Sequence, residues 1–362
     1  MKKIFVTEPS LPDRKKFDAY VDRIFESRRL TNNGPLVNEL TQRLEDYLGV
    51  RHIIPVANGT LALQIAYKLL GLQGEVITTP FTFIATASSL AWEGLGIRFA
   101  DIDSKTLNID LTQIEQTITA KTSALLPVHV FGNPCDVEQI QGIADRHGLK
   151  VVYDASHAFG IKYKERSVLE WGDVSTLSFH ATKLFHAVEG GALIIREKAL
   201  ADKARKLINF GFTSQESIEC LGINAKMNEF QAAMGLALLD NHEENLAQRR
   251  EITEMYDARL SNLVGRQVWN EFASNNYGYY PVLFGSEEQA LKAKNALSEE
   301  NVFVRRYFYP SLEGLDFLGE SKIMLKNTRD VASRILCLPL FPGLGKGDIE
   351  RVTEVIASVT GI

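Results

Sequence analysis

Short apolar runs alternate with amphipathic stretches over residues 38–260. Apolar residues at helical spacing predict a helix over Thr60–Leu70, and a second helix over Val137–His147 follows the turn residues NPCD. Compact apolar runs predict buried strands at Glu75–Thr78, Ile97–Asp101, Ser123–Phe131, Lys150–Asp154, Val174–Phe179 and Ala192–Ile195. Strands that alternate with helices at this spacing are typical of an α/β protein with a mostly parallel sheet.

The pattern changes after residue 225. Apolar residues recur at helical spacing at Met227, Phe230, Met234 and Leu238, and a looser version continues to Leu260. This predicts one long helix, or one broken twice. A strand follows at Tyr279–Phe284, with helices at 288–299 and 346–359. We therefore expect a large domain over 1–245, including an N-terminal arm, and a small C-terminal domain over 246–362.

Composition removes several classes of protein. The chain has 362 residues, with 40 basic and 45 acidic side chains and a net charge of -5, whereas general nucleic-acid binders carry a basic excess. The three cysteines are far apart, which argues against a disulfide scaffold or a cysteine zinc site. The apolar start is too short for a signal peptide, and no apolar run is long enough to span a membrane. We expect a cytoplasmic protein.

Common catalytic motifs are absent. The sequence has no dinucleotide-binding GxGxxG, no P-loop, no GxSxG elbow and no HExxH. His180 and His186 lie six residues apart, which is not metal-ligand spacing on a helix, so we expect no metal site.

Polar residues at strand ends remain as candidates. Asp154 ends a buried strand, where parallel sheets bind ligands, although it could equally cap a helix. Lys183 stands among apolar neighbours, and desolvation would make its amine a nucleophile; a surface lysine is the plainer alternative. Glu189 precedes two glycines, which either admit a ligand or form a tight turn.

Residues Asn58, Gly59 and Thr60 precede or open a predicted helix. Free N–H groups there, with the Thr60 hydroxyl, could hold a phosphate or merely belong to an ordinary helix cap. An amine nucleophile, a carboxylate and a phosphate cradle are together the parts of a pyridoxal phosphate site.

The order of motifs resembles the DegT/DnrJ/StrS family of sugar aminotransferases over essentially the whole chain. The matching stretches are LTNNGPLVNEL (30–40), VANGTLAL (56–63), TTPFTFIATASS (78–89), ADIDSKTLNID (100–110), LLPVHVFGNPCD (125–136), VVYDASHAFG (151–160), LSFHATKLFHAVEGGAL (177–193) and GINAKMNEFQAAMGLALL (222–239). The resemblance implies the fold-type-I architecture of pyridoxal phosphate enzymes: an α/β fold with a mixed, mostly parallel seven-stranded sheet in a large domain, a smaller C-terminal α+β domain, and a homodimer with shared active sites.

The resemblance also implies roles for the catalytic pair. Lys183 matches the lysine that holds pyridoxal 5'-phosphate as a Schiff base and shuttles the proton. Asp154 matches the partner of the pyridine nitrogen, which it keeps protonated. Sugar dehydratases of a sister branch replace the lysine with histidine, so the presence of Lys183 argues against dehydration.

Further roles follow by position. Gly59, Thr60 and Ser178 match phosphate ligands. Phe83 matches the aromatic residue that lies over the cofactor ring, and His157 matches a residue near the hydroxyl group of that ring. Asn224 matches a residue that reaches the phosphate from the neighbouring subunit. Glu189 lies in the segment EGG, which the family places near the sugar site.

The implied reaction takes an amino group from L-glutamate and gives it to a nucleotide-linked ketosugar. The segments SFHATK, EGG, GINAKMNE and RRYFYP look most like the branch that acts at C4 of dTDP-4-keto-6-deoxyglucose. Another ketosugar (galacto product, 3-keto sugar, or UDP or GDP carrier) and a non-catalytic regulatory protein are the alternatives. Candidate diphosphate or nucleotide contacts, which could also be surface residues, are Arg305, Arg306, Tyr307 and Tyr309.

Overall fold

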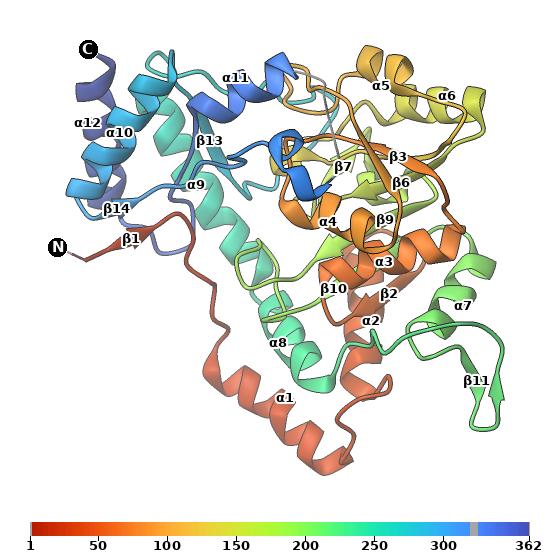
Figure 1. Ribbon diagram of the computed structural model, residues 1–362. Helices are drawn as coiled ribbons and strands as arrows, with labels where there is room; N and C mark the ends of the chain where they lie inside the picture. Colours follow the sequence, from red (N-terminus) through yellow and green to blue (C-terminus); the bar gives the residue numbers. More distant parts are fainter. Residues whose placement is uncertain (1, 319–324, 362) are drawn as a thin grey trace.

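A seven-stranded mixed sheet forms the centre of the N-terminal part in this computed structural model, which describes residues 2–318 and 325–361 (Figure 1). In spatial order its strands are β2 (Ile53–Val56), β10 (Gly191–Ile195), β9 (Val174–Ser178), β6 (Lys150–Asp154), β5 (Thr122–Leu126), β3 (Glu75–Thr78) and β4 (Gly96–Phe99). Strand β10 runs antiparallel to both of its neighbours, and the other pairs are parallel. The predicted α/β class and the seven-stranded, mostly parallel sheet are confirmed.

Both faces of the sheet are covered, because side chains alternate between them along each strand. On β6, Tyr153 belongs to one buried cluster and Val152 to the other. The first cluster lies under α2 (Pro35–Leu48), α6 (Val137–His147) and α8 (Glu229–Leu239), and includes one residue of each of α1 (Arg14–Ser27) and α5 (Leu111–Thr117). The second lies under α3 (Gly59–Leu70), α4 (Ile84–Trp92) and α7 (Lys198–Leu207).

One predicted strand is wrong in its second half. The apolar run Ser123–Phe131 forms strand β5 only as far as Leu126. Pro127 follows and has no N–H to donate to a neighbouring strand. The chain then forms a 3₁₀ turn, η1 (Val130–Gly132), in which Phe131 has a left-handed backbone with φ of 57°.

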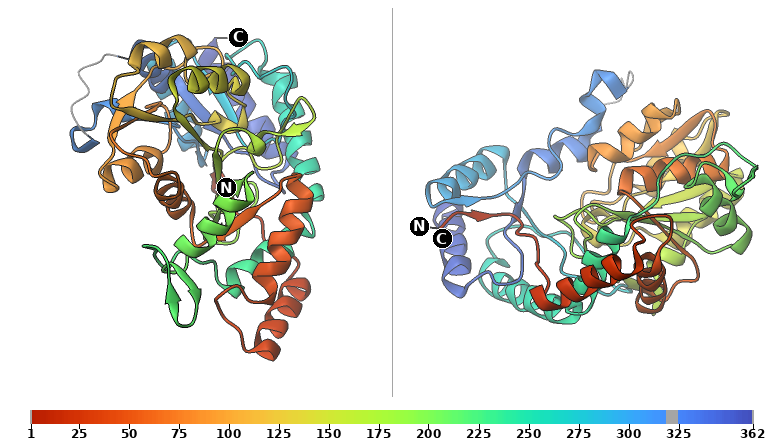
Figure 2. Two further views of the ribbon diagram at one scale, coloured as in Figure 1. Left: turned by 90° about the vertical axis from the view of Figure 1, so that its right-hand side faces the viewer. Right: turned by 90° about the horizontal axis from the view of Figure 1, so that it is seen from below.

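The long apolar pattern after residue 225 is two helices with one break. A capping box at Asn228 begins α8, so Met227 lies before the helix. The break falls at Asp240 and Asn241, and α9 (His242–Leu260) follows. Figures 1 and 2 show α8 and α9 running in succession from the sheet to the C-terminal elements, with α1 beside α8.

The C-terminal elements are β13 (Tyr280–Leu283), α10 (Glu287–Glu299), β14 (Val302–Phe303), η3 (Leu312–Gly314), η4 (Asp316–Leu318), α11 (Lys326–Arg334), β15 (Ile335–Leu338) and α12 (Lys346–Thr360). Residues of η3, η4, α11 and β15 pack against residues of the N-terminal part such as Phe81, Ala87 and Val128. Residues of β13, α10, β14, β15 and α12 form a separate core with α9. Strand β1 (Ile4–Phe5) pairs with β14, and Ile4 joins this core. The N-terminal strand thus packs with the C-terminal elements, and the division at residue 245, inside α9, stays a prediction.

Two small hairpins lie outside the central sheet, and the first of them packs into the first buried cluster through Tyr163. They are β7–β8 (Lys162–Tyr163 and Arg166–Ser167) and β11–β12 (Phe212–Ser214 and Ser217–Ile218), and η2 (Val168–Glu170) follows the first. No helix within residues 2–318 and 325–361 is both long and apolar enough to cross a bilayer.

Candidate active site

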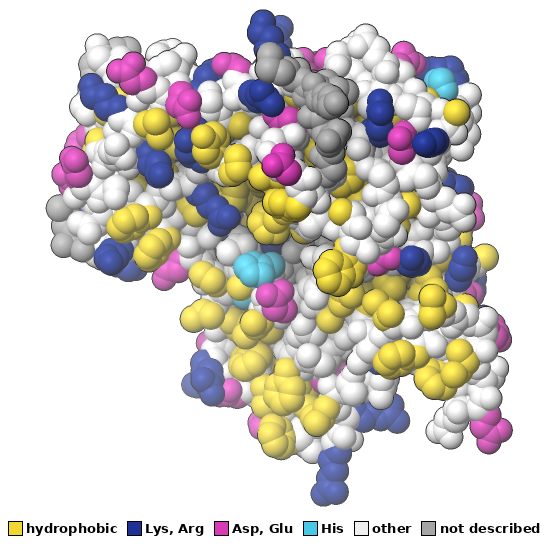
Figure 3. Space-filling model, viewed as in Figure 1, with side chains coloured by type: hydrophobic (Ala, Val, Ile, Leu, Met, Phe, Trp, Pro, Cys, Tyr) yellow, Lys and Arg dark blue, Asp and Glu magenta, His cyan; other side chains and the backbone are white. Residues whose placement is uncertain are grey.

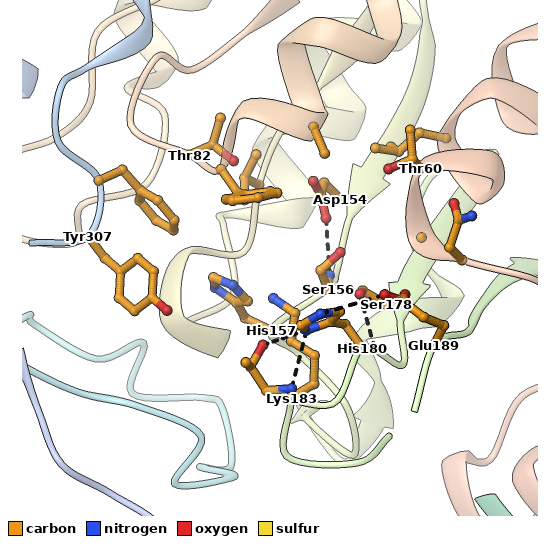
Figure 4. Close-up of a pocket in the computed structure, with 18 of the residues that line it drawn as sticks. Thr60, Thr82, Asp154, Ser156, His157, Ser178, His180, Lys183, Glu189 and Tyr307 are labelled. Carbon is orange, nitrogen blue, oxygen red and sulfur yellow. Dashed lines mark hydrogen bonds and ion pairs between the residues drawn. The ribbon is translucent and has the colours of Figure 1, made fainter. Parts of the chain in front are cut away.

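A cavity of about 720 Å³ opens where strands β6 and β9 end, between the sheet and the C-terminal elements. Figure 3 shows the molecule hollowed near the middle of this face. Ten of the residues proposed from sequence line it: Gly59, Thr60, Phe83, Asp154, His157, Ser178, Lys183, Glu189, Arg305 and Tyr307. The close-up in Figure 4 has Thr60 and Ser178 on one side, Tyr307 on the other, and Asp154, His157 and Lys183 between them.

The N-terminus of α3 forms one wall. The Asn58 carboxamide accepts the N–H of Leu61 at 2.9 Å and so caps the helix. A helix cannot satisfy its own first N–H groups, which here belong to Gly59 and Thr60 and lie at the cavity. A Cβ at Gly59 would stand 2.9 Å from the Cβ of Ser178, so glycine lets these two segments meet. The wall therefore presents backbone donors and two hydroxyl groups, which suit a phosphate.

Asp154 is buried, with 6% of its surface exposed, at the end of β6. Its carboxylate accepts a hydrogen bond from the Thr86 hydroxyl at 2.7 Å and one from the Ser156 N–H at 3.1 Å. No helix begins after it, so the helix-cap interpretation of Asp154 is wrong. The two bonds hold the carboxylate in place and leave oxygen lone pairs for a positively charged or N–H group in the cavity.

Lys183 lies in the loop between β9 and β10. Its backbone N–H donates to the His180 carbonyl at 2.9 Å, and its Nζ is 3.4 Å from the Tyr279 hydroxyl. Burial lowers the pKa of Lys183 to about 8; the positive charge of Arg305 acts in the same direction, and Asp154 opposes both. The amine is therefore neutral far more often than an ordinary lysine near neutral pH, which is what a nucleophile requires.

His157 is held by its backbone surroundings. The Phe131 N–H donates to Nδ1 of His157 at 3.2 Å, so the neutral ring carries its proton on Nε2. The imidazole ring stacks on Phe131 and Phe308. Burial and the nearby Lys183 hold the pKa of His157 well below its usual value. His157 is therefore a neutral hydrogen-bond donor at physiological pH.

The remaining wall residues bring aromatic surface and charge. Phe83, at the start of α4, lines the cavity with 51% of its surface exposed. The Arg305 guanidinium lies over the Tyr307 ring at 4.5 Å. Glu189 stands 3.7 Å from Nε2 of His180 at the cavity.

Three proposed residues lie outside the cavity. Arg306 stacks on Tyr309, forms an ion pair with Glu287 and donates to the Ser333 carbonyl. These contacts direct it away from the cavity that its neighbour Arg305 lines, so the structure does not support Arg306 and Tyr309 as substrate contacts. Asn224 forms a backbone bridge with Asn209 and does not line this cavity, and its implied role requires a second chain.

The sequence did not single out several residues that belong to the site. Tyr279 stands beside Lys183, and Thr86 and Ser156 hold Asp154. Ser156 lies two residues from a recognised aspartate, which is a usable signal. Thr86 lies in the matching stretch TTPFTFIATASS, close to Phe83, so a signal was available there too, whereas Tyr279 is distant in sequence and carried none. Within the described residues, no group of three or more histidine, cysteine or carboxylate side chains is arranged to hold a metal ion.

Comparisons with known proteins agree with this geometry. Residues 12–357 match the family model described as the DegT/DnrJ/EryC1/StrS aminotransferase family. A dTDP-4-amino-4,6-dideoxy-D-glucose transaminase from Shigella dysenteriae is 41% identical over 364 residues, covering 99% of each chain. A protein of the same name from Escherichia coli is 38% identical and covers 98% of each. The crystal structure of DesI with its TDP-sugar product superposes with a TM-score of 0.93 at 36% identity, covering 100% of this chain and 94% of DesI.

Proposed function

Because the chain belongs to the DegT/DnrJ/EryC1/StrS aminotransferase family, we propose that it moves the amino group of L-glutamate to C4 of dTDP-4-keto-6-deoxyglucose. The product would be dTDP-4-amino-4,6-dideoxyglucose, a precursor for surface polysaccharide. The observation that carries the proposal is that Lys183, Asp154 and the N-terminus of α3 line one cavity. The names of the two relatives support the choice of sugar and nucleotide.

The residues of the cavity fit pyridoxal 5'-phosphate. When bound, this cofactor supplies an aldehyde that links to an amine and a ring that takes up the electron pair of a broken Cα–H bond. Gly59, Thr60 and Ser178 would hold its phosphate through the N–H groups and hydroxyls described above. Phe83 would cover a face of the ring, and Nε2–H of His157 could donate to its hydroxyl oxygen.

Asp154 and Lys183 would divide the proton chemistry. The Asp154 carboxylate, fixed by Thr86 and Ser156, would keep a pyridine nitrogen protonated. The neutral amine of Lys183 would accept the α-proton of glutamate and deliver it to the cofactor's aldehyde-derived carbon, two bonds from Cα. Glutamate would leave as 2-oxoglutarate, whose keto oxygen comes from water. The same steps in reverse would place the amine on the sugar and release the C4 oxygen as water.

A homodimer completes the proposal. Exposed large apolar side chains gather on α1, the β11–β12 hairpin and the segments around α8: Phe25, Leu30, Phe210, Phe212, Ile218, Leu221, Ile223 and Phe230. Figure 3 shows hydrophobic side chains over the lower part of this face. Such a surface is typical of a protein interface. Asn224 lies in this segment, and we propose that it reaches the phosphate in the cavity of the second chain.

The test is to incubate the purified protein with L-glutamate, pyridoxal phosphate and dTDP-4-keto-6-deoxyglucose. We expect a 4-amino sugar, identified by mass and by proton NMR, whose ring couplings give the configuration at C4. Lys183→Ala should lose both this activity and the visible absorption band of the bound cofactor. A wild-type protein that stays colourless with pyridoxal phosphate would contradict the proposal, and a fully active monomer in sedimentation would contradict the shared site.

A further inference from the structure

Arg305 brings an unpaired positive charge to the cavity. Its main chain is fixed, because Cys337 and Arg305 exchange backbone hydrogen bonds at 2.8 and 3.4 Å. Its side chain is exposed to the cavity and lies over Tyr307, and no described carboxylate comes within 4.0 Å of its guanidinium. The neighbouring Arg306 is the opposite case, since its side chain is only 11% exposed and pairs with Glu287.

The position of Arg305 relative to the reacting amine limits what it can bind. Arg305 lines the same cavity as Lys183, and its charge contributes to the low pKa of that amine. The phosphate-binding wall at Thr60 lies on the other side of the cavity from Tyr307, over which Arg305 is stacked (Figure 4). Arg305 is therefore suited to an anion near the reacting carbon, and not to the phosphate of the cofactor.

The two substrates differ in where their negative charge lies. In L-glutamate the α-carboxylate is bonded directly to the carbon that loses its proton. In the nucleotide sugar the diphosphate is attached to C1, across the ring from the reacting C4. A planar guanidinium can donate two parallel hydrogen bonds to a carboxylate. On these grounds we propose that Arg305 binds the α-carboxylate of the amino donor and thereby selects an amino acid over a simple amine.

This inference rests on the proposed function, and a pair of donors tests it directly. L-Glutamate and 4-aminobutanoate carry the same γ-carboxylate, but only glutamate has the α-carboxylate. We would measure the first half-reaction of wild-type protein, Arg305→Gln and Arg305→Lys with each donor, and use Arg306→Lys as the matched control. Arg305→Gln should raise the KM for glutamate about 10- to 100-fold, because a hydrogen-bonded charge pair is lost, and leave that for 4-aminobutanoate within about twofold. The KM of Arg305→Lys for glutamate should lie between those of the wild type and Arg305→Gln, and that of Arg306→Lys should match the wild type.

Equilibrium binding provides a readout that does not depend on turnover. α-Methyl-L-glutamate has no α-proton to lose, so its affinity can be titrated without transamination. Its Kd should rise in Arg305→Gln by the same factor as the KM. The Kd of dTDP, measured by calorimetry, should stay unchanged, which also shows that the variant is folded.

Three results would overturn the assignment. A parallel loss of dTDP affinity and of the ketosugar half-reaction would make Arg305 a diphosphate contact. An equal rise in KM for glutamate and for 4-aminobutanoate would mean that Arg305 binds the γ-carboxylate instead. Unchanged kinetics in both half-reactions would show that it binds neither substrate. Failure of the proposed function is distinguishable from all three, because the wild type itself would then not react with glutamate.

Discussion

Gly191 is the residue at which strand β10 meets the start of α3. It is the first residue of β10 and pairs with Val56 on one side and Ser178 on the other. A Cβ at Gly191 would stand 2.7 Å from the carbonyl carbon of Asn58 and 2.7 Å from the nitrogen of Gly59. Gly191→Ala therefore places a methyl group against the backbone that forms the proposed phosphate cradle.

The size of the effect follows from this overlap. Non-bonded carbon atoms prefer separations of about 3.5 to 4.0 Å, so the backbone must move by nearly 1 Å. Overpacking of this kind costs about 1–3 kcal/mol. If displacement of the α3 N-terminus relieves the overlap, the free energy lost from phosphate binding is of this order. The affinity for pyridoxal phosphate should then fall about 5- to 150-fold.

The assay compares two ligands and two glycines. Apoprotein is titrated with pyridoxal phosphate and with pyridoxal, which has no phosphate, and binding is followed by absorbance. Gly191→Ala should lower the affinity for pyridoxal phosphate and leave the affinity for pyridoxal unchanged. Gly142→Ala, in helix α6, is the control, because the nearest atom to its Cβ would be the end of the Arg146 side chain at 3.6 Å. Wild-type affinity of Gly191→Ala for pyridoxal phosphate, or an equal loss for pyridoxal, would refute the reasoning.

Three further predictions concern charge. Because the pKa of Lys183 is lowered to about 8, the neutral fraction of its amine should rise about tenfold per pH unit from pH 6 to 7 and level off above pH 8. The rate at which apoprotein takes up pyridoxal phosphate, measured by stopped-flow absorbance, should follow this fraction. A rate that still rises tenfold per unit at pH 9 would contradict the lowered pKa. Asp154→Asn should still bind the cofactor but slow the glutamate half-reaction about 10²- to 10³-fold, because the charge facing the pyridine nitrogen is lost; single-turnover kinetics that match the wild type would argue against this contact. The buried Asp101 accepts two hydrogen bonds from Thr328 at 2.7 and 2.8 Å and one from the Asn327 N–H at 2.9 Å. Asp101→Ala should therefore lower the free energy of unfolding by about 3 kcal/mol in urea denaturation, and a loss below about 0.5 kcal/mol would show that these bonds contribute little.

The parts of the fold that local chemistry determines could be predicted from the sequence. Strands β3 and β6 and helix α6 have the predicted bounds, since turn residues or glycines flank their apolar patterns. The strand expected to end at Phe131 ends at Leu126, because Pro127 has no N–H to donate; beyond it, an isolated bridge joins Val128 to Asp154 before the 3₁₀ turn begins. Whether a helix breaks once or twice depends on how its two halves pack, which periodicity does not reveal.

The site divides in the same way. Lys183, Asp154 and Gly59 lie in local motifs, and the structure places all three in one cavity. Tyr279 reaches Lys183 from 96 positions further along the chain, so only the folded arrangement brings them together. Arg305 and Arg306 are adjacent and chemically identical. Which of them enters the cavity depends on the pairing of Arg305 with Cys337, a long-range contact that a single sequence does not contain.

The pairing of β1 with β14 limits how the C-terminal elements can move. They are joined to the sheet through α9 and a second time through the chain that runs from β1 to α1. The hydrogen bonds of Asn327 and Thr328 to Asp101, and an apolar cluster that includes Phe81 and Phe308, connect the same elements at further points. Arg305 and Tyr307 therefore belong to a part of the molecule that several separate attachments hold against the α3 side of the cavity. A chain that lacked its first five residues would lose one of these attachments and keep the others.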